Sequence, residues 1–439
     1  MTPPPPAPPG LSDSAAAAAS ATSPVSGASA TSFTSAGSAV SSASATSAPS
    51  AAAASAAFAI PAEPPLRGAA EGTVAHGACS GDTLNAPPAP CASRESAAGA
   101  SAAPAASVGP FAVAVSAAPV RYDVLVLGEV LVEVHAEAPL RGAVDGTAAR
   151  VSYSGDALNA AAAAAAAGAR TALLAVVGDD ELSVPLLRRA ADLGIDVSHV
   201  RHAPRPNGAY LLASDPEGDR AFVYWRTHSA GSTLSTRHIA SWRELLTGST
   251  ALITSGITGA LSPTSRDAVL AAARAVHAAG GHLSYDPNFR PRLAGRAEAR
   301  ELLARIAPLT GLLKSSCPAD ARALVDTGDP RTAAARYRAL GARAVAVTAG
   351  ADRLLLDEGA GEPAYHPVPP NPHPVDATGA GDCFTGTATA RIALGDTLAD
   401  AVAYGTAAAS LSVSGRGGTG RIPAFHETAA LAAAHRGAR

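Results

Sequence analysis

The chain has 439 residues, of which 47% are hydrophobic and 16% are charged, and its formal net charge is −3. Length alone would allow two or three domains. Lys314 is the only lysine, so no stripe of basic residues marks a binding surface for nucleic acid or for an acidic membrane. We also find no apolar run of about 18 residues, the length that a membrane-spanning helix requires. We therefore expect neither nucleic acid nor a membrane as a partner.

Residues 1–120 differ in composition from the rest of the chain. They consist almost entirely of Ala, Ser, Pro, Gly and Thr, and contain few large apolar side chains. Such a segment cannot bury enough apolar surface to offset the entropy lost on ordering, which predicts a disordered tail. A proline run follows Met1 where a signal peptide would have a basic start and an apolar stretch. The cysteines show no metal-binding spacing, and the whole pattern favours a reducing cytoplasm.

From Tyr122 onward, apolar strand-like runs alternate with helical stretches. Strands are predicted at 123–128, 171–177, 251–255, 282–286, 311–315 and 343–348, and helices at 156–168, 181–193 and 264–279. Strands that alternate with helices of 10 to 15 residues indicate a parallel sheet covered on both faces. The fold class predicted for residues 121–430 is therefore α/β, in three layers around a mainly parallel central sheet.

A predicted hairpin interrupts this alternation. Its strands are 208–213 and 220–226, joined by a turn at 214–219, and we expect it to lie outside the main sheet. Side chains alternate between the two faces of a strand. One face of the second strand would carry Phe222, Tyr224 and Arg226, and the other Val223 and Trp225. The first of these faces is polar enough to contact a ligand.

The string Val375-Asp-Ala-Thr-Gly-Ala-Gly-Asp-Cys-Phe-Thr-Gly386 leads from an extended segment into an apolar helix. Thr378 is a natural N-cap, and the small residues Gly379, Ala380 and Gly381 would leave the first helical N–H groups accessible to an anion. Asp382, in the same turn, could accept the proton of an attacking hydroxyl group. The same residues could equally do no more than start a helix favourably. Residue chemistry alone leaves both interpretations open.

The string Asp-x-Thr-Gly-Ala-Gly-Asp followed by Phe resembles the signature of the ribokinase-like (PfkB) sugar kinases. The resemblance extends over about 122–424. It implies an α/β domain with a small β lid, whose strands would fall within about 129–153 and 207–226. It also implies ATP as phosphoryl donor, Mg²⁺, Asp382 as catalytic base, and Gly379, Ala380 and Gly381 beside the transferred group.

Other nucleotide-binding motifs are missing or lack the right context. The only lysine follows a leucine, which excludes a P-loop, and Gly415–Gly420 matches Gly-x-Gly-x-x-Gly without a preceding strand or a following helix. The resemblance implies that this loop, through Gly418, and the strand end containing Thr348 and Gly350 border the nucleotide. An ordinary loop and an ordinary strand end remain the alternative.

Ser154-Gly-Asp-Ala-Leu-Asn159 resembles the family segment that contacts sugar hydroxyl groups. The resemblance implies that Gly155, Asp156 and Asn159 bind substrate, although Asp156 could simply cap a helix. A similar string at 80–85 lacks a flanking strand or apolar helix, and we attribute it to chance or to sequence decay.

Three further strings, 219–226, 255–266 and 286–293, resemble the 2-keto-3-deoxygluconate kinases, a branch of the family whose substrate carries a carboxylate. Guanidinium groups hold carboxylates with two charge-assisted hydrogen bonds. Arg226 and Arg290 are the candidates for this role, although a solvated strand end and a local ion pair would explain them equally. Tyr210 and Tyr224 would supply hydroxyl groups or an apolar wall. We interpret Arg292 as structural.

Two positions depart from the family pattern. Cys317-Pro-Ala-Asp320 stands where many members have Asn-x-x-Glu, a motif linked to Mg²⁺, so that Asp320 is a weak candidate metal ligand. Ala294 stands where the branch often has Trp. The prediction is phosphorylation of a sugar acid, 2-keto-3-deoxygluconate, at the expense of ATP. The alternatives are a kinase of a neutral sugar such as fructose or ribose, or a catalytically silent sugar or nucleotide sensor. Resemblance also implies that a homo-oligomer can form through the lid.

Overall fold

The computed structural model describes residues 122–138, 145–213 and 221–437, all within one compact unit. The expected tail at 1–120, the turn at 214–219 and the string at 80–85 lie outside the described residues. The last helix continues to Gly437, past residue 430, where we expected the domain to end. No described helix is long and apolar enough to cross a membrane.

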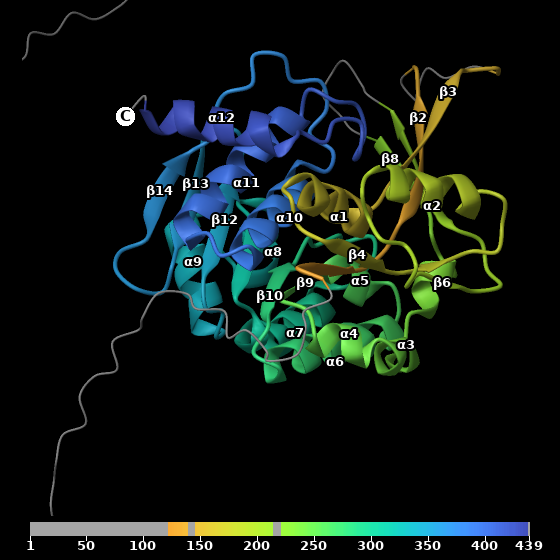
Figure 1. Ribbon diagram of the computed structural model, residues 1–439, viewed down its shortest axis with the longest axis horizontal. Coiled ribbons are helices and arrows are strands. Elements are labelled where there is room, and N and C mark those ends of the chain that lie inside the picture. Colours follow the sequence, from red (N-terminus) through yellow and green to blue (C-terminus); the bar gives the residue numbers. More distant parts are fainter. Residues whose placement is uncertain (1–121, 139–144, 214–220, 438–439) are drawn as a thin grey trace, which may run out of the picture. The chain divides into compact units, whose positions relative to one another are not determined.

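An eight-stranded sheet forms the centre of the described chain (Figure 1). Its strands have the spatial order β14-β13-β12-β11-β10-β9-β1-β4, and the six from β12 to β4 run parallel. The strands β13 and β14 add an antiparallel edge that we did not predict. The bounds are β1 (Val124–Leu127), β4 (Thr171–Leu174), β9 (Ala251–Ser255), β10 (His282–Asp286), β11 (Leu312–Ser316), β12 (Val345–Ala349), β13 (Arg353–Asp357) and β14 (Ala364–Pro367).

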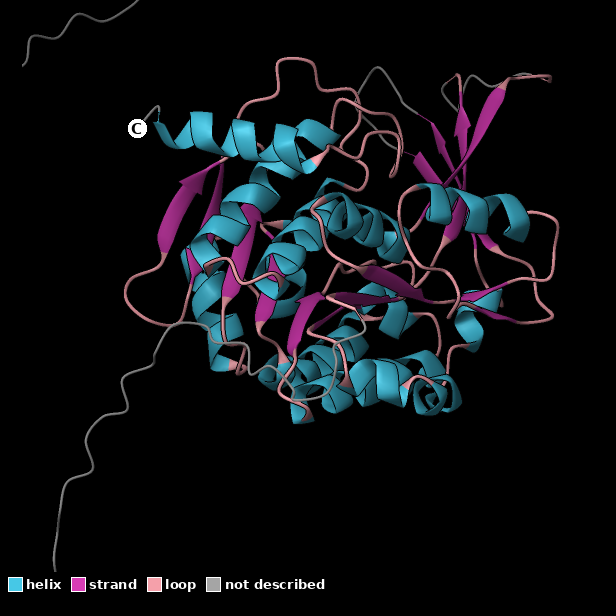
Figure 2. Ribbon diagram, viewed as in Figure 1, coloured by secondary structure: helices cyan, strands magenta, loops and turns pink. Residues whose placement is uncertain are grey.

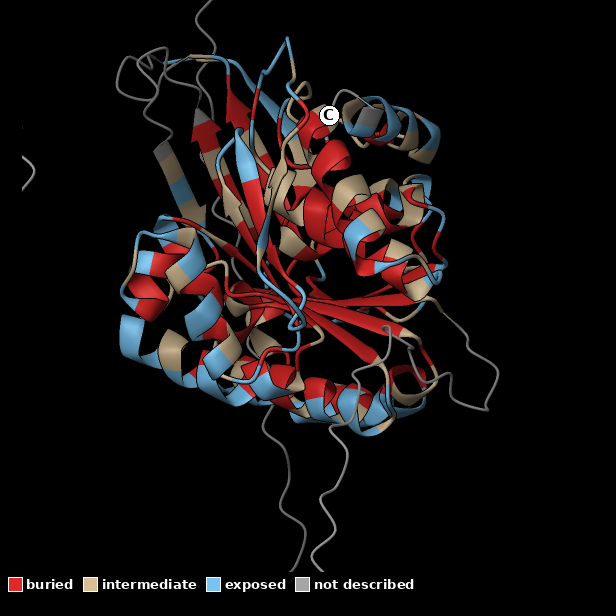
Figure 3. Cartoon of the chain, turned by 90° about the vertical axis from the view of Figure 1, so that its left-hand side faces the viewer, coloured by how far each residue is buried: buried red, intermediate tan, exposed pale blue. Residues whose placement is uncertain are grey.

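Helices cover both faces of this sheet, as the continuous apolar strands require. In β1, Leu125 and Leu127 join one core, whereas Val124 and Val126 join the other. Figure 3 shows the buried strands between two helical layers with exposed outer faces. On the face of Val124 lie α1 (Asp156–Ala166), α2 (Ser183–Asp192), α10 (Ala380–Ala393) and α11 (Leu398–Ser412), with α12 (Phe425–Gly437) packed on α11. On the face of Leu125 lie α3 (Thr236–Ser241), α4 (Arg243–Thr247), α6 (Pro263–Ala278), α7 (Arg296–Ile306), α8 (Ala319–Val325) and α9 (Pro330–Ala339). The remaining short elements are α5 (Gly256–Ala260), η2 (Ala230–Thr233) and η3 (Ala307–Leu309).

A second, four-stranded sheet stands beside the central one and forms the predicted lid (Figure 2). Its order is β3-β2-β7-β8, with β2 (Leu131–Ala136), β3 (Ala149–Ser154), β7 (Gly208–Ala213) and β8 (Ala221–Trp225). Phe222 and Tyr224 pack against Tyr210 on one face, while Val223 and Trp225 are exposed on the other. The predicted alternation of the two faces is therefore confirmed.

The single strand predicted at 171–177 is two strands in the structure, with a break at Ala175. The chain leaves the central sheet after Leu174 and forms β5 (Val176–Val177), which pairs with β6 (Arg201–His202) in a separate two-stranded sheet. The carbonyl oxygen of Ala175, between the two strands, accepts a hydrogen bond from the Arg201 N–H group. Because both pieces are buried, hydrophobicity could not reveal this break.

Candidate active site

A pocket of about 820 Å³ opens between the lid and the carboxyl ends of the central parallel strands. The order of connections reverses at β1, which has β4 on one side and β9 on the other. Ligands bind at such switch points in open α/β sheets. The sequence-predicted residues that line the pocket are Gly155, Asp156, Asn159, Tyr210, Tyr224, Arg226, Arg290, Asp320, Gly379, Gly381 and Asp382.

The amino end of α10 forms one end of the pocket, but its N-cap is not the residue we predicted. Gly379 is the N-cap, with φ of 77°, a left-handed conformation that favours glycine. Thr378 instead donates from its N–H and hydroxyl groups to Asp376, at 2.9 and 2.8 Å. Asp376 also accepts the N–H of Gly417 at 2.9 Å. The first aspartate of the motif therefore links the start of α10 to the glycine-rich loop.

The first turn of α10 presents two N–H groups that helix geometry leaves without an intrahelical acceptor, those of Gly381 and Asp382. The third expected amide, that of Ala380, donates to the Ala377 carbonyl at 3.3 Å, and Ala380 does not line the pocket. A Cβ at Gly381 would lie 2.6 Å from Lys314 Nζ. Glycine is therefore required here for the lysine to approach the turn.

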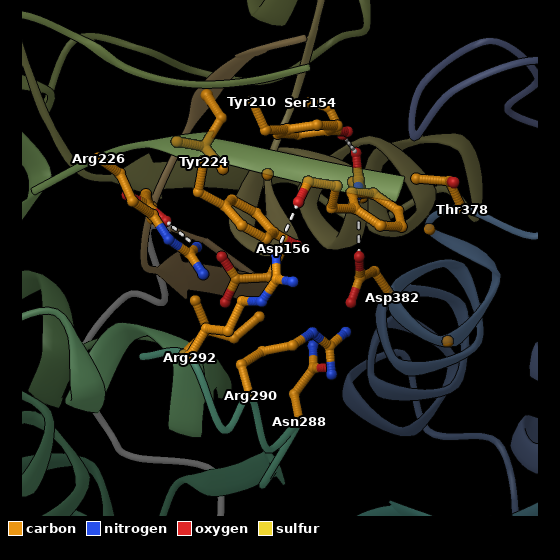
Figure 4. A pocket seen from close by; sticks show the side chains of 18 of the residues that line it. Ser154, Asp156, Tyr210, Tyr224, Arg226, Asn288, Arg290, Arg292, Thr378 and Asp382 are labelled. Carbon is orange, nitrogen blue, oxygen red and sulfur yellow. Dashed lines mark hydrogen bonds and ion pairs between the residues drawn. The ribbon is translucent and has the colours of Figure 1, made fainter. Parts of the chain in front are cut away.

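Asp382 faces the pocket from this first turn, and Figure 4 shows it below Ser154. Asn159 Nδ2 donates to Asp382 Oδ2 at 2.9 Å, and Ser154 Oγ donates to Asn159 Oδ1 at 3.2 Å. Burial, together with the negative charge of Asp156, raises the pKa of Asp382 to about 7. A carboxylate with a pKa near neutrality is well suited to act as a general base.

Lys314 is a pocket residue that our sequence reasoning missed. Its Nζ lies 2.7 Å from Asp286 Oδ2, and both side chains are buried. Burial alone would lower the pKa of Lys314, but Asp286, Asp320 and Asp382 outweigh it and raise the pKa. The signal was present in the sequence, because a lysine within a buried apolar strand is rare unless it is paired.

Two carboxylates near Lys314 bear on the expected metal. Asp320 accepts the N–H of Phe289 at 2.9 Å and the N–H and Oγ–H groups of Ser316 at 3.0 and 2.6 Å. Among the described residues, no group of three or more His, Cys, Asp or Glu side chains could hold a metal ion. Mg²⁺ usually needs only one or two carboxylates in addition to phosphate and water oxygens. Asp286 and Asp320 fit that smaller requirement.

A buried ion pair lies at the lid side of the pocket. Arg226 Nη1 donates to Glu129 Oε2 at 2.9 Å, and the guanidinium carbon lies 4.3 Å from the centre of the Tyr224 ring. Burial raises the pKa of Glu129 to about 7, against the opposing effect of Arg226. Glu129 follows Gly128 at the end of β1, and sequence reasoning did not single it out.

Asp156 is the first residue of α1, and the N-cap is Gly155, so the capping alternative for Asp156 is not what the structure shows. One carboxylate oxygen, Oδ2, accepts hydrogen bonds from the hydroxyl groups of Ser255 and Thr258. The other, Oδ1, is buried without a hydrogen-bond partner. A buried acceptor of this kind normally has a partner, and a sugar hydroxyl group would provide one.

Aromatic and basic side chains complete the sugar end of the pocket (Figure 4). Tyr210 packs against Tyr224, but its hydroxyl group donates to Glu133, so the Tyr210 ring and not its hydroxyl is offered to a ligand. Arg290 and Arg292 are exposed and line the same pocket as the two tyrosines. Arg292 also donates to the Phe222 carbonyl at 3.0 Å, which ties its loop to the lid. It therefore has the structural contact that we expected and a place in the pocket that we did not.

Three predicted nucleotide contacts do not line this pocket: Thr348, Gly350 and Gly418. Thr348 lies near the end of β12, and Gly350 follows that strand with φ of 70°. Gly418 is buried against Asn159 and Gly379. Their contact with a nucleotide stays a prediction.

A family described as pfkB family carbohydrate kinase matches residues 122–424. The chain belongs to the pfkB family of carbohydrate kinases. Its relatives include the 2-dehydro-3-deoxygluconokinases of Thermoproteus tenax and Escherichia coli strain K12, each 30% identical. These matches cover 70% and 67% of this chain and 94% and 96% of the relatives. An Escherichia coli structure named as a ribokinase II, with ATP and Mg²⁺, is 26% identical with a TM-score of 0.64, over 71% of this chain and 99% of that one.

As a pfkB carbohydrate kinase, the protein is a phosphotransferase, and use of ATP with Mg²⁺ is a general trait of such kinases. The predicted ribokinase-like fold, a mainly parallel sheet with a small β lid, is confirmed.

Proposed function

We propose that this kinase transfers the γ-phosphoryl group of ATP to the primary hydroxyl group of 2-keto-3-deoxygluconate, giving the 6-phosphate. The observation that carries this proposal is that one pocket is lined both by the candidate base Asp382 and by three arginines, Arg226, Arg290 and Arg292. Arginine suits a carboxylate, and an aspartate suits a hydroxyl group to be deprotonated. A sugar acid carries both groups, at opposite ends. The names of the two relatives reported above support the same substrate.

Asp382 is the proposed catalytic base. Asn159 occupies its Oδ2, which leaves Oδ1 to take the proton from the sugar O6–H group. O6 then forms a bond to the γ-phosphorus, while the bond between that phosphorus and the oxygen bridging to the β-phosphate breaks. The electron pair of that bond leaves with ADP, and the proton on Asp382 passes to solvent. Such a transfer depends mainly on positioning and on stabilisation of charge.

Charge on the transferred group would be stabilised by the Gly381 and Asp382 amides and by Lys314. The two N–H groups lie at the positive end of the α10 dipole, where anions bind. Lys314 Nζ is close enough to Gly381 to reach the same anion, while Asp286 holds it in place. Asp286 and Asp320 would hold Mg²⁺ through water or directly, and Mg²⁺ would neutralise phosphate charge.

A kinase of a neutral sugar, such as fructose or ribose, is the second candidate. The observation that favours it is the ion pair of Arg226 with Glu129, whose side chains are 8% and 1% exposed. This pair already neutralises one of the three arginines. A substrate carboxylate would then depend on Arg290 and Arg292, and if neither of them contacts the substrate, a neutral sugar would fit the pocket equally well.

An assay of ADP release with ATP and Mg²⁺ distinguishes the two. The panel is 2-keto-3-deoxygluconate, 2-keto-3-deoxygalactonate, fructose, ribose and gluconate, each tested on the parent protein and on Arg290→Gln. An exposed arginine on α4, Arg243→Gln, is the matched control. We expect kcat/KM to be highest for a keto-deoxy acid and to fall in Arg290→Gln for the sugar acids but not for fructose or ribose. Activity confined to fructose or ribose would refute the sugar-acid proposal while retaining the kinase.

A further inference from the structure

One buried carboxylate joins the lid to the glycine-rich loop Gly415–Gly420. Glu133, on β2, is 1% exposed. Its Oε2 accepts the N–H group of Gly418 at 3.1 Å and also the hydroxyl group of Tyr210. Its Oε1 accepts the Ser152 hydroxyl group at 2.8 Å. Lid strands β2, β3 and β7 and the loop therefore meet at one side chain.

The loop packs so closely against this carboxylate and the catalytic groups that two of its glycines have no room for a side chain. A Cβ at Gly417 would overlap the Glu133 carboxylate, and Gly417 also has φ of 76°. A Cβ at Gly418 would lie 2.5 Å from Asn159 Oδ1. The Gly418 carbonyl would lie 2.9 Å from a Cβ at Gly379, the N-cap of α10. The loop thus fills the space between the lid and the start of the catalytic helix.

These contacts form a continuous path from the lid to the base. Glu133 holds Gly418, Gly418 packs against Asn159, and Asn159 donates to Asp382. At its other end, Glu133 holds Tyr210, whose ring lines the sugar end of the pocket. A buried carboxylate must keep hydrogen-bond donors around it, since losing one leaves a desolvated charge without compensation. The lid and the loop are therefore expected to stay docked together.

We propose that Glu133 is a positioning residue that fastens the glycine-rich loop to the lid and so sets the placement of Asn159 and Asp382. The proposal rests on the proposed function, because it assigns Asp382 the role of base. Glu133 does not contact substrate in this scheme. Its loss should reduce the rate of phosphoryl transfer more than it reduces affinity for the sugar.

Glu133→Gln tests this with little change in size, because it removes the charge that strengthens the hydrogen bond from the Gly418 N–H group and leaves one oxygen atom in place of two. Ser152→Ala is the matched control, since it removes one hydrogen bond to the same carboxylate and leaves those to Gly418 and Tyr210. Hydrogen exchange of the full-length protein, without ligands, should be about tenfold faster in residues 413–424 of Glu133→Gln and unchanged in Ser152→Ala. Exchange in the central strand at 251–255 should be unchanged in both. If Glu133→Gln fails to fold, Glu133→Asp is the second variant, because its side chain is too short to reach Gly418. It should show the same increase in hydrogen exchange in residues 413–424.

The kinetic measurement is a separate readout. In Glu133→Gln, kcat should fall by about tenfold or more, whereas KM for the sugar should stay within about threefold, as for a lost transition-state contact. Unchanged loop exchange would overturn the proposal, and so would exchange that rises equally in the central sheet. If the parent protein phosphorylates no sugar, the proposed function fails, but the exchange experiment still decides whether Glu133 holds the loop. If the parent is active and loop exchange does not respond, the proposal about Glu133 fails alone.

Discussion

Replacement of Lys314 by methionine should separate the contribution of this lysine to stability from its contribution to catalysis. At the observed separation of 2.7 Å, the attraction between Lys314 and Asp286 is roughly 6 kcal/mol at an effective dielectric constant of about 20. Removing one partner of a buried pair typically costs about 3–5 kcal/mol, because the other is left buried and unpaired. We expect Lys314→Met to lower Tm by roughly 5–8 °C, given the unfolding entropy of a domain of about 300 residues. We also expect kcat to fall by about 10²–10³, the cost of losing one group that stabilises transition-state charge.

The double variant Lys314→Met/Asp286→Asn is the control. It removes both charges, and since a buried pair contributes little net stability compared with neutral residues, Tm should recover most of the loss. The low kcat should not recover, because the cation near Gly381 is still missing and the charge of Asp286, a proposed Mg²⁺ ligand, is now missing as well. Thermal melts and the ADP-release assay measure the two quantities on the same preparations. Recovery of both Tm and kcat in the double variant would refute the catalytic role of Lys314.

Four further predictions concern other parts of the protein. Since burial raises the pKa of Asp382 to about 7, kcat/KM should fall as pH drops through this value. The same raised pKa destabilises the folded state as pH rises from the pKa of a free carboxyl group through about 7. Thermal melts of Asp382→Asn should therefore show a gain in stability over the parent at pH 8 and none at pH 4. Arg290→Gln should raise KM for a keto-deoxy acid by about tenfold or more, the cost of a lost charge-assisted hydrogen bond, and leave KM for ATP unchanged. If the exposed lid face forms a homo-oligomer, Trp225→Glu should yield a monomer by light scattering, and a parent protein that is already monomeric would refute this.

The parallel sheet and the lid hairpin could be predicted because each strand carries its own apolar pattern. The bounds expected for β9 and β10 agree with the structure residue for residue. The break at Ala175 could not be predicted, because β4 and β5 are both buried and hydrophobicity does not distinguish the two sheets to which they belong. The edge strands β13 and β14 were missed for a different reason. We expected the alternation of helices and parallel strands to continue, and this hairpin ends it.

The phosphate end of the site was predictable because its residues are contiguous in one motif. The position of the N-cap was wrong, since the left-handed conformation of Gly379 and the binding of Thr378 by Asp376 depend on the folded loop. The expected Ala380 amide is also not available, because it donates to the Ala377 carbonyl. The residues that sequence reasoning missed are those whose partners come from distant elements. Glu129 pairs with an arginine 97 residues away, and Glu133 with a glycine 285 residues away. Neither pairing has a local sequence pattern.

The chemistry of Asp382 depends on a balance between two opposed effects. Burial and the negative charge of Asp156 raise its pKa, which makes the carboxylate a stronger base but favours its protonated form. The hydrogen bond from Asn159 and the charge of Lys314 lower the pKa and so help to keep it ionised. Without the first pair of effects, Asp382 would be too weak a base, and without the second it would be protonated at neutral pH. Asn159 therefore helps to keep the base ionised. A sugar hydroxyl group that replaces water beside Asp382 would then contact a carboxylate that can accept its proton.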